Sequence, residues 1–312
     1  MPPRLTFILG CTASGKASLG LELARRSGGE IISIDSMKVY RRMDIGTAKP
    51  SPQVRAEVPH HLIDIVEPSE EFSVAQYVQL AERAIADIHS RGRPIFVVGG
   101  TPLYIKALSE GLFEGPGADP EVRERLQRVA ERDGAPALHE RLKQVDPDAA
   151  KRIHPNDLRR LVRALEVYEL TGKPISSLQE QWDRERTRYE CAFIGVRRDK
   201  EDLSRRINER VRRMMAAGLV DEVKSLLAED RPLSTAARQA LGYAEIIAHL
   251  SGGPKLAETI ELIKINTRQF AKAQRTWFKR FRATEWIDVS ADATVTEVAD
   301  ALMTARRDLW SA

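Results

Sequence analysis

Cysteine is scarce in this sequence, and long apolar runs are absent. Its 312 residues include only two cysteines, Cys11 and Cys191, which are too few for a disulfide framework and lack metal-ligand spacing. The longest apolar runs, such as residues 95–98, have the length of strands, and none approaches the roughly 20 residues that span a bilayer. The N-terminus lacks the basic, apolar and small-residue succession of a signal peptide. We therefore expect a cytoplasmic protein with reduced thiols.

Neither sign of charge dominates the composition. The chain has 49 Lys and Arg against 45 Asp and Glu, a net charge of +4. Bulk charge of this size is weak evidence for nucleic-acid binding, so a basic surface has to come from where the charges lie. A hydrophobic content of 42% and a charged content of 30% are those of an ordinary globular protein.

Short β-branched and apolar runs alternate with helical patterns over much of the chain. We expect strands at residues 5–9, 31–34, 95–98, 192–196 and 286–289. Residues 73–91 show a helix between two signals, a capping box formed by Ser73 and Gln76 and a stop at Gly92. The alternation predicts an α/β fold with a parallel sheet flanked by helices on both faces.

The alternation stops between about residues 115 and 190. Asp119 and Pro120 suggest an N-cap followed by proline at the first helical position, and three or four helices follow without a convincing strand. We therefore predict a core made of residues 1–114 and 191–312, interrupted by an all-helical insertion at residues 115–190.

A glycine-rich turn joins the first expected strand to a helix. Residues 10–16 have the sequence GCTASGK. Strand, loop and helix in this order are typical of a P-loop, in which backbone N–H groups and a lysine bind phosphate oxygens, although a turn without a ligand is the simplest alternative. We predict a phosphate loop that binds phosphate through Gly10, Thr12, Ala13, Ser14, Gly15, Lys16 and Ala17.

Ala17 departs from this motif, which normally has Ser or Thr after the lysine to bind Mg²⁺. Ser18 is one residue further round the helix and does not replace that hydroxyl. The residues that would hold a metal are therefore unknown from the sequence.

A second pattern lies near the C-terminus, where residues 259–281 predict one long helix. Its basic residues recur every three or four positions and form a stripe, which is either a solvated face or a phosphate-binding surface. The stripe consists of Lys264, Arg268, Lys272, Arg275 and Lys279, and we expect Ile263, Thr267, Phe270, Gln274 and Phe278 to pack inward.

Five blocks of sequence resemble the tRNA dimethylallyltransferase family. They are IDSMKVY (34–40), MDIGTAKP (43–50), PHHLIDI (59–65), GGTPLY (99–104) and TRQFAKAQRTWF (267–278). Their order is that of the family, and they are spread across almost the whole chain. The resemblance implies a P-loop NTPase-like fold and transfer of a dimethylallyl group from its diphosphate to an adenine amine beside the anticodon of tRNA.

The resemblance also implies roles for individual residues. The phosphate loop would hold the diphosphate of dimethylallyl diphosphate, with Mg²⁺ as cofactor. Asp35 matches the general base, Thr101 a threonine lining the reaction channel, and Arg210 an arginine that holds the diphosphate. The partners would be dimethylallyl diphosphate and tRNA, bound by a monomer. The positions matching tRNA contacts are Asp35, Ser36, Met37, Lys38, Arg159, Arg160, Leu161, Val162, Arg163, Gln239, Gly242, Tyr243, Lys272, Arg275 and Lys279.

The chain departs from the family pattern at four positions near the site. Cys11 replaces proline, Ala17 threonine, Lys38 glutamine and Arg42 glycine. Lys38 can only donate hydrogen bonds, whereas glutamine also accepts them. Asp35 could be a turn carboxylate, since such residues are common after strands, but its place at a strand end favours a functional role. His60 and His61 lack partners at ligand spacing, so we interpret them as structural.

Three other functions compete with the one implied by the resemblance. A P-loop kinase for a small molecule would need the Mg²⁺-binding hydroxyl that Ala17 lacks. An enzyme that prenylates free adenine nucleotides would not need the helical insertion or the basic stripe. A tRNA-binding relative that has lost catalysis would account for the four departures, although Asp35, Thr101, Lys16 and Arg210 are retained.

Overall fold

The computed structural model describes residues 2–111, 115–178 and 188–310. The chain divides into two compact units, one formed by Met1–Ser109 with Arg188–Ala312 and the other by Glu110–Thr187. The insertion predicted at residues 115–190 thus corresponds to a unit that begins five residues earlier and ends three residues earlier. Each unit has its own hydrophobic core.

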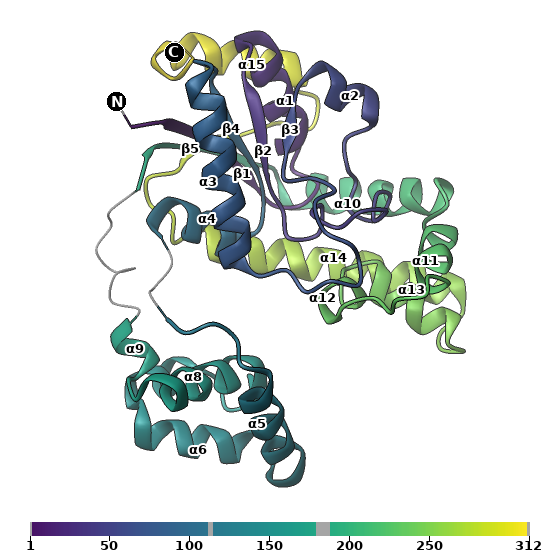
Figure 1. The fold of residues 1–312 in the computed structure, drawn as a ribbon. Coiled ribbons are helices and arrows are strands. Elements are labelled where there is room, and N and C mark those ends of the chain that lie inside the picture. The colour runs from purple at the N-terminus through teal and green to yellow at the C-terminus, as the bar shows by residue number, and fades with distance from the viewer. Residues whose placement is uncertain (1, 112–114, 179–187, 311–312) are drawn as a thin grey trace. The chain divides into compact units, whose positions relative to one another are not determined.

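The first unit contains a six-stranded parallel sheet in the order β3-β2-β4-β1-β5-β6 (Figure 1). The strands are β1 (Arg4–Gly10), β2 (Glu30–Ile34), β3 (His60–His61), β4 (Ile95–Gly99), β5 (Glu190–Arg197) and β6 (Glu285–Asp288). This arrangement confirms the predicted fold class and the five predicted strands. Strand β3 was not predicted, because it is only two residues long and therefore has no alternating pattern.

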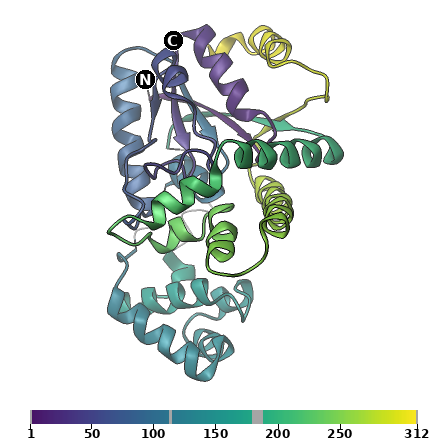
Figure 2. The same cartoon turned by 90° about the vertical axis from the view of Figure 1, so that its right-hand side faces the viewer.

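Helices cover both faces of this sheet. On one face α1 (Lys16–Ser27) and α15 (Val295–Ala305) pack on apolar side chains of β1, β4 and β5. On the other lie α3 (Val74–Ser90), α4 (Pro102–Glu110) and α14 (Leu256–Phe278). Figure 2 shows blue α3 and purple α1 on opposite sides of the strands. The capping box predicted for Ser73 and Gln76 is present at the start of α3.

A separate helical cluster packs on the loop that follows β2. It is formed by α10 (Lys200–Ala216), α11 (Leu219–Leu227), α12 (Thr235–Arg238), α13 (Tyr243–Leu250) and α14. Its core also takes in Val39, Tyr40 and Met43 from the loop after β2, which is followed by α2 (Pro52–Glu57). The loop after β2 is therefore shaped by helices that come much later in the chain.

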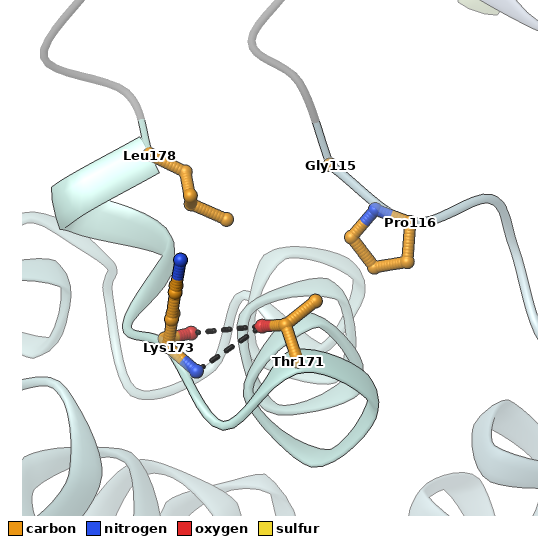
Figure 3. A pocket seen from close by; sticks show the side chains of 5 residues that line it. All are labelled: Gly115, Pro116, Thr171, Lys173 and Leu178. Carbon is orange, nitrogen blue, oxygen red and sulfur yellow. Dashed lines mark hydrogen bonds between the residues drawn. The ribbon is translucent and has the colours of Figure 1, made fainter.

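The second unit is all-helical within its described residues. It contains α5 (Pro120–Asp133), α6 (Ala135–Val145), α7 (Pro147–Arg152), α8 (Leu158–Thr171) and α9 (Ile175–Leu178). Asp119 is the N-cap of α5 and Pro120 its first residue, as predicted. A cavity of about 550 Å³ in this unit is lined by Gly115, Pro116, Thr171, Lys173 and Leu178 (Figure 3).

No helix in the described part of the chain is long and apolar enough to cross a membrane.

Candidate active site

The phosphate loop connects the end of β1 to the start of α1. Gly15 is the N-cap of α1 with φ +99°, and Ala13 also has a positive φ of 64°. A Cβ at Gly10 would lie 2.5 Å from Ser14 Oγ and 2.8 Å from the Val196 carbonyl, so only glycine fits there. Lys16 Nζ donates a hydrogen bond of 3.1 Å to the Cys11 carbonyl. The loop therefore curls around its own lysine at the N-terminus of a helix, where anions bind favourably.

Two arginines that were not predicted from the sequence bind the backbone of this loop. Arg198 Nε donates to the Ser14 carbonyl at 2.8 Å, and Arg206 Nε donates to the Ala13 carbonyl at 2.9 Å. Arg198 is itself held by Asp202 at 3.0 Å, with both side chains at most 6% exposed. Arg206 could have been found from the sequence, because it lies four residues before Arg210 and shares its helix face.

A cavity of about 640 Å³ opens in front of the phosphate loop. Three segments line it, namely the phosphate loop with the first turn of α1, the loop Asp44–Lys49 (the 44–49 loop) and one face of α10. The lining residues are Ala13, Gly15, Lys16, Ala17, Ser18, Asp44, Ile45, Ala48, Lys49, Arg206, Glu209, Arg210, Arg213, Met214 and Ala217. Cations outnumber carboxylates in this lining, which suits a polyanionic ligand.

Asp35 and Thr101 meet at the carboxyl edge of the sheet, as their positions after β2 and β4 predict. Thr101 Oγ1 accepts a hydrogen bond of 3.1 Å from the Ser36 N–H. Asp35 Oδ1 accepts from the N–H groups of Met37 at 2.9 Å and Lys38 at 3.3 Å. Asp35 is thus a turn carboxylate as well as a candidate base, since its Oδ2 makes no hydrogen bond within the described part of the chain.

The electrostatics link Asp35 to three cations. Desolvation, followed by the repulsion of Arg210, lowers the pKa of Lys16 to about 8. Desolvation also lowers the pKa values of Lys38 and Arg210. The negative charge of Asp35 acts in the opposite direction on all three groups. A carboxylate, the phosphate-loop lysine and the α10 arginine therefore share one site.

Gln274 of α14 connects the phosphate loop to the segment that follows β4. Its Oε1 accepts from the Thr12 N–H at 2.8 Å, and its Nε2 donates to the Gly100 carbonyl at 2.7 Å. The side chain is 4% exposed. Gln274 was expected to pack inward, which is confirmed, but no role was predicted for it. A side-chain amide at a position expected to face inward was the available signal, because buried polar groups need hydrogen-bond partners.

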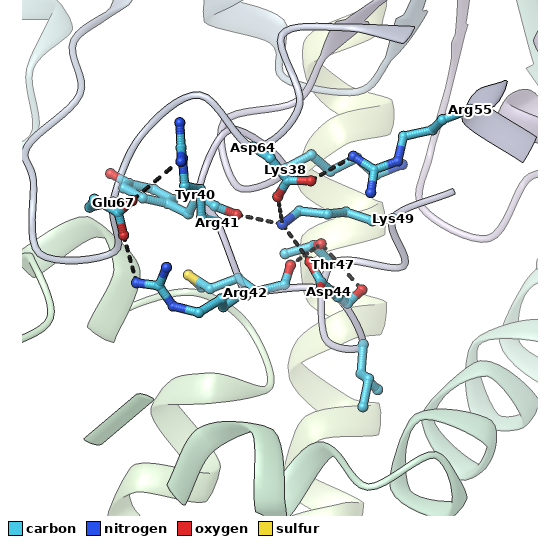
Figure 4. Close-up of polar contacts among 12 residues, drawn as sticks. Lys38, Tyr40, Arg41, Arg42, Asp44, Thr47, Lys49, Arg55, Asp64 and Glu67 are labelled. Atoms are coloured by element: carbon cyan, nitrogen blue, oxygen red, sulfur yellow. Dashed lines mark hydrogen bonds and ion pairs between the residues drawn. The ribbon is translucent and has the colours of Figure 1, made fainter. Parts of the chain in front are cut away.

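Lys49 anchors the 44–49 loop from within (Figure 4). Its side chain is 2% exposed, and Nζ donates to Asp44 Oδ1 and Asp64 Oδ1, each at 2.6 Å, and also to the Tyr40 carbonyl. Asp64 also accepts from Arg55 at 2.6 Å. The two carboxylates and the carbonyl compensate the burial of the ammonium group.

Arg42, one of the four departures from the family pattern, has a backbone conformation that favours glycine. Its φ is +60°, in the left-handed region that favours glycine. The arginine side chain pairs with Glu229 at 2.8 Å and with Glu67 at 2.6 Å. These contacts fix a residue whose backbone is strained.

The described residues do not form a metal cage. They include no group of three or more His, Cys, Asp or Glu side chains placed to hold a metal ion. Ala17 lines the cavity without a hydroxyl, and Asp44 is engaged by Lys49. These residues alone do not form a closed Mg²⁺ site, but Mg²⁺ in proteins is usually held by few carboxylates together with the phosphates of the substrate. Mg²⁺ as cofactor therefore stays a prediction. His60 and His61 are hydrogen-bonded to the Val58 carbonyl and to Glu30, each at 2.7 Å, in keeping with a structural role.

Two of the five tRNA contacts predicted on α8 are wrong for their side chains. Leu161 and Val162 are 0% and 5% exposed and belong to the core of the helical unit, because the apolar stripe of an amphipathic helix faces inward. Arg163 is half-buried and donates to Glu166 at 2.6 Å and to the Pro116 carbonyl at 2.8 Å. Arg159 and Arg160 are exposed, so their predicted contacts with tRNA stay predictions.

The predicted contacts at residues 239–243 also need correction. Gln239 is exposed, but Gly242 is buried and Tyr243 is 0% exposed. Tyr243 OH donates to Glu222 Oε1 at 2.6 Å, and its ring packs against Gly46. Tyr243 is therefore a core residue whose side chain has no surface to offer to RNA. Ser36, Met37 and Lys38 are half-buried in the loop after β2.

The long helix is present as α14 (Leu256–Phe278), but the predicted basic stripe is shorter than expected. Lys264 is 7% exposed and pairs with Glu261 at 2.6 Å. Arg268 donates to Asn208 at 2.7 Å. Phe270, expected to pack inward, is 45% exposed. The exposed basic residues are Lys272, Arg275 and Lys279.

Comparison with known proteins gives a consistent result. The family model described as IPP transferase matches residues 38–281. A tRNA dimethylallyltransferase from Geobacter metallireducens is 51% identical over 91% of this chain and 92% of its own, and one from Geobacter sulfurreducens is 50% identical over 93% of both.

Solved structures agree with these sequence relatives. A tRNA isopentenylpyrophosphate transferase from Bacillus halodurans has a TM-score of 0.71 and 40% identity, with 98% of both chains covered. A eukaryotic dimethylallyltransferase described as acting on tRNA has a TM-score of 0.79 and 28% identity, covering 98% of this chain and 79% of that one. Together with the phosphate loop and the carboxylate at the sheet edge, these matches establish that the chain belongs to the IPP transferase family.

Proposed function

We propose that this protein transfers the dimethylallyl group of dimethylallyl diphosphate to the exocyclic amine of the adenosine immediately 3′ of the anticodon in tRNA. The products are isopentenyladenosine in tRNA and free diphosphate. One observation carries the proposal, namely that Asp35 lies within electrostatic reach of both Lys16 and Arg210. A candidate base and cations suited to an anionic leaving group thus share one site in a chain 51% identical to a tRNA dimethylallyltransferase.

In this proposal the diphosphate lies against the phosphate loop and the arginines of α10. Lys16, Arg206 and Arg210 line the cavity in front of the loop and would balance the charge of the leaving group. The bond between the allylic carbon and the diphosphate oxygen breaks, and its electron pair leaves with the diphosphate. The amine nitrogen forms the new bond to the same carbon.

Asp35 would orient the amine and accept its proton as this bond forms, because an adenine amine is a poor nucleophile. Its Oδ1 is held by two backbone N–H groups, which fixes the carboxylate and leaves Oδ2 for the substrate. Thr101, hydrogen-bonded to Ser36, would line the same edge. An enclosed site would also keep water from the allylic carbon.

The tRNA would approach the basic residues exposed on α14, and its target base would leave the stack to reach Asp35. Lys272, Arg275 and Lys279 are the residues we propose for phosphate contacts, with Arg159 and Arg160 of the helical unit. A cytoplasmic location, a monomeric state and a role for Mg²⁺ stay predictions.

The test is to incubate the protein with dimethylallyl diphosphate, Mg²⁺ and unmodified tRNA and to analyse the nucleosides by mass. We expect prenylated adenosine in tRNA and none on free adenine nucleotides. Product on free nucleotides would favour the nucleotide prenyltransferase, and phosphate transfer from ATP would favour the kinase. Binding of tRNA without product would indicate a relative that has lost catalysis.

Asp35→Asn is the matched control for the chemical step. The amide keeps the oxygen that accepts from Met37 and Lys38, so the turn after β2 should fold as before. Single-turnover rates should fall by a factor on the order of 10² to 10⁴, the usual effect of removing a positioned base. Rates within about threefold of the unmodified protein would remove Asp35 from this role.

A further inference from the structure

Glu222 of α11 holds the wall of the cavity that faces the phosphate loop. Its Oε2 accepts from the N–H groups of Asp44 at 2.9 Å and Ile45 at 2.8 Å. Its Oε1 accepts from the Gly46 N–H at 3.2 Å and from Tyr243 OH at 2.6 Å. One carboxylate therefore receives four hydrogen bonds, three of them from consecutive backbone N–H groups.

These three N–H groups begin a tight turn of the chain. Ala48 N–H donates to the Ile45 carbonyl at 3.1 Å, and Lys49 N–H donates to the Asp44 carbonyl at 3.0 Å. Successive N–H groups at the start of such a turn form a concave site for an anion. Glu222, which lies far along the chain from Lys49, occupies that site in the manner of an N-cap supplied by another helix.

The turn is fastened at both ends. At its start, Glu222 accepts from the N–H groups of Asp44, Ile45 and Gly46. At its end, the buried ammonium of Lys49 donates to Asp44 and Asp64 (Figure 4). Between these two fastenings, Ile45 and Ala48 face the cavity that Lys16 and Arg210 line from the other side. Tyr243 packs behind the turn, where a Cβ on Gly46 would collide with its ring.

We propose that Glu222 is a positioning residue for diphosphate binding, which holds the 44–49 loop at the distance from Lys16 and Arg210 that the ligand requires. The inference rests on the proposed function, since it takes the ligand of the cavity to be a diphosphate. Glu222 itself does not line the cavity, so it acts through the loop. The ligand class is a diphosphate ester or inorganic pyrophosphate.

The sign of the effect separates positioning from simple electrostatics. Removing a negative charge near a site for an anion strengthens anion binding by Coulomb's law. Glu222→Gln should instead weaken it, because the amide presents N–H donors where backbone N–H groups and a hydroxyl need an acceptor. The 44–49 loop then loses part of the hydrogen bonding that positions it and no longer fits the ligand. We expect the Kd for pyrophosphate to rise about tenfold, the equivalent of one hydrogen bond to a charged group.

The experiment measures pyrophosphate binding to the full chain by calorimetry, with thermal unfolding in parallel. Glu229→Gln is the matched control, because it removes the same charge from a carboxylate that binds the Arg42 side chain rather than the loop backbone. Its Kd should stay within about twofold of the unmodified protein, within the range typical of a distant surface charge. Tyr243→Phe, which leaves the three N–H bonds in place, should change the Kd by less than about threefold.

Gly46→Ala tests the position of the 44–49 loop without changing any charge. The added methyl group collides with the Tyr243 ring and pushes the loop outward, so the Kd should also rise. Glu222→Gln and Gly46→Ala both displace the 44–49 loop, so the Kd of the double variant should rise by less than the product of the single effects. Gly46→Ala also decides the matter if Glu222→Gln fails to fold.

Steady-state kinetics add a second measurement. The KM for dimethylallyl diphosphate should rise about tenfold in Glu222→Gln, while kcat at saturation and the KM for tRNA stay within about threefold, because the loop does not touch the reacting atoms. Unchanged or tighter pyrophosphate binding would overturn the proposal, and so would a lower melting temperature at constant Kd. If the unmodified protein binds no pyrophosphate, both the proposed function and the role of Glu222 fail. If the unmodified protein binds pyrophosphate and only the Glu222→Gln result disagrees, the role of Glu222 fails alone.

Discussion

Binding of diphosphate should weaken as the pH rises through the pKa of Lys16. Desolvation in the phosphate loop and the charge of Arg210 lower this pKa to about 8, far below the usual value for lysine. Lys16 is therefore an ammonium ion at neutral pH and a neutral amine in mildly alkaline solution. The positive charge is what the anionic ligand needs, so a proton has to be taken up on binding at high pH.

The size of the effect follows from the distance between the pH and the pKa. With a pKa of about 8, roughly nine tenths of Lys16 is charged at pH 7 and roughly one tenth at pH 9. The Kd for pyrophosphate should thus rise about tenfold between these values, on top of any change caused by titration of the ligand. Calorimetry between pH 6.5 and 9.5, about one and a half units on either side of this pKa, covers the transition.

Lys16→Arg provides the reference, because a guanidinium stays charged throughout this range. Titration of pyrophosphate affects both proteins equally, so the ratio of their Kd values isolates Lys16. We expect the ratio to be constant below about pH 7 and to change about tenfold per unit above the pKa. In Asp35→Asn the break should move to lower pH, since Asp35 raises the pKa of Lys16. A ratio independent of pH up to about 9.5 would refute the reasoning.

The same shift predicts how stability depends on pH. The folded-state pKa of Lys16 lies below that of the unfolded chain, so burial of the ammonium destabilises the fold below about pH 8. Between this pH and the unfolded pKa of about 10.4, the unfolded chain binds more protons, and the contribution of Lys16 to the free energy of unfolding should rise with pH.

Three further predictions concern other parts of the chain. Arg42→Gly relieves a left-handed backbone but loses two half-exposed ion pairs, so its free energy of unfolding in urea should stay within about 1 kcal/mol of that of the unmodified protein. Arg42→Ala loses the same ion pairs and keeps the backbone strain, so it should be about 1 kcal/mol less stable than Arg42→Gly. Replacing Lys272, Arg275 and Lys279 by glutamine should lower the salt dependence of tRNA binding by about one log–log unit for each phosphate that is no longer neutralised, at constant affinity for pyrophosphate; an unchanged slope would mark them as solvated residues. Ala17→Thr restores a hydroxyl in the lining of the cavity and should tighten diphosphate binding at low Mg²⁺, and superimposable Mg²⁺ titrations would contradict this.

Local patterns in the sequence were enough to predict the parts of the fold that form locally. The strand, glycine-rich loop and helix around Lys16, the capping box at Ser73 and the N-cap at Asp119 are all present. Asp35 and Thr101 meet because parallel strands end at the same edge of a sheet, which follows from topology alone.

Contacts between distant segments could not be predicted in this way. Gln274 joins Thr12 to Gly100, and Glu222 seats a turn that comes far earlier in the chain, yet neither pairing has a signature in the sequence. The transfer of whole family blocks also assigned surface roles to core residues such as Leu161 and Tyr243.

On α14 the spacing of the charges predicted the direction of the stripe correctly but not its extent. Lys264 lies at the margin of the buried face, where a lysine can bury its stem and pair with Glu261 one turn earlier. Phe270 was expected on the side of the helix that faces the protein, yet nothing covers it fully. Periodicity gives the phase of a helix, whereas burial depends on what packs against each turn.

The site combines two kinds of residue that contribute to binding in different ways. Arg198, Gln274 and Glu222 bind backbone groups of the phosphate loop and the 44–49 loop, and they determine shape. Lys16 and Arg210 have lowered pKa values chiefly because their charges are desolvated, and repulsion by Arg210 acts on Lys16 while repulsion by Arg213 acts on Arg210. These cations therefore bear an electrostatic cost in the absence of ligand. Because Asp35 opposes that cost only in part, an anion that neutralises these cations should bind more tightly than its hydrogen bonds alone would suggest. The backbone contacts of Arg198, Gln274 and Glu222 hold the phosphate loop and the 44–49 loop in place around these cations, so we expect the loss of any one of these contacts to lower the affinity for the anion.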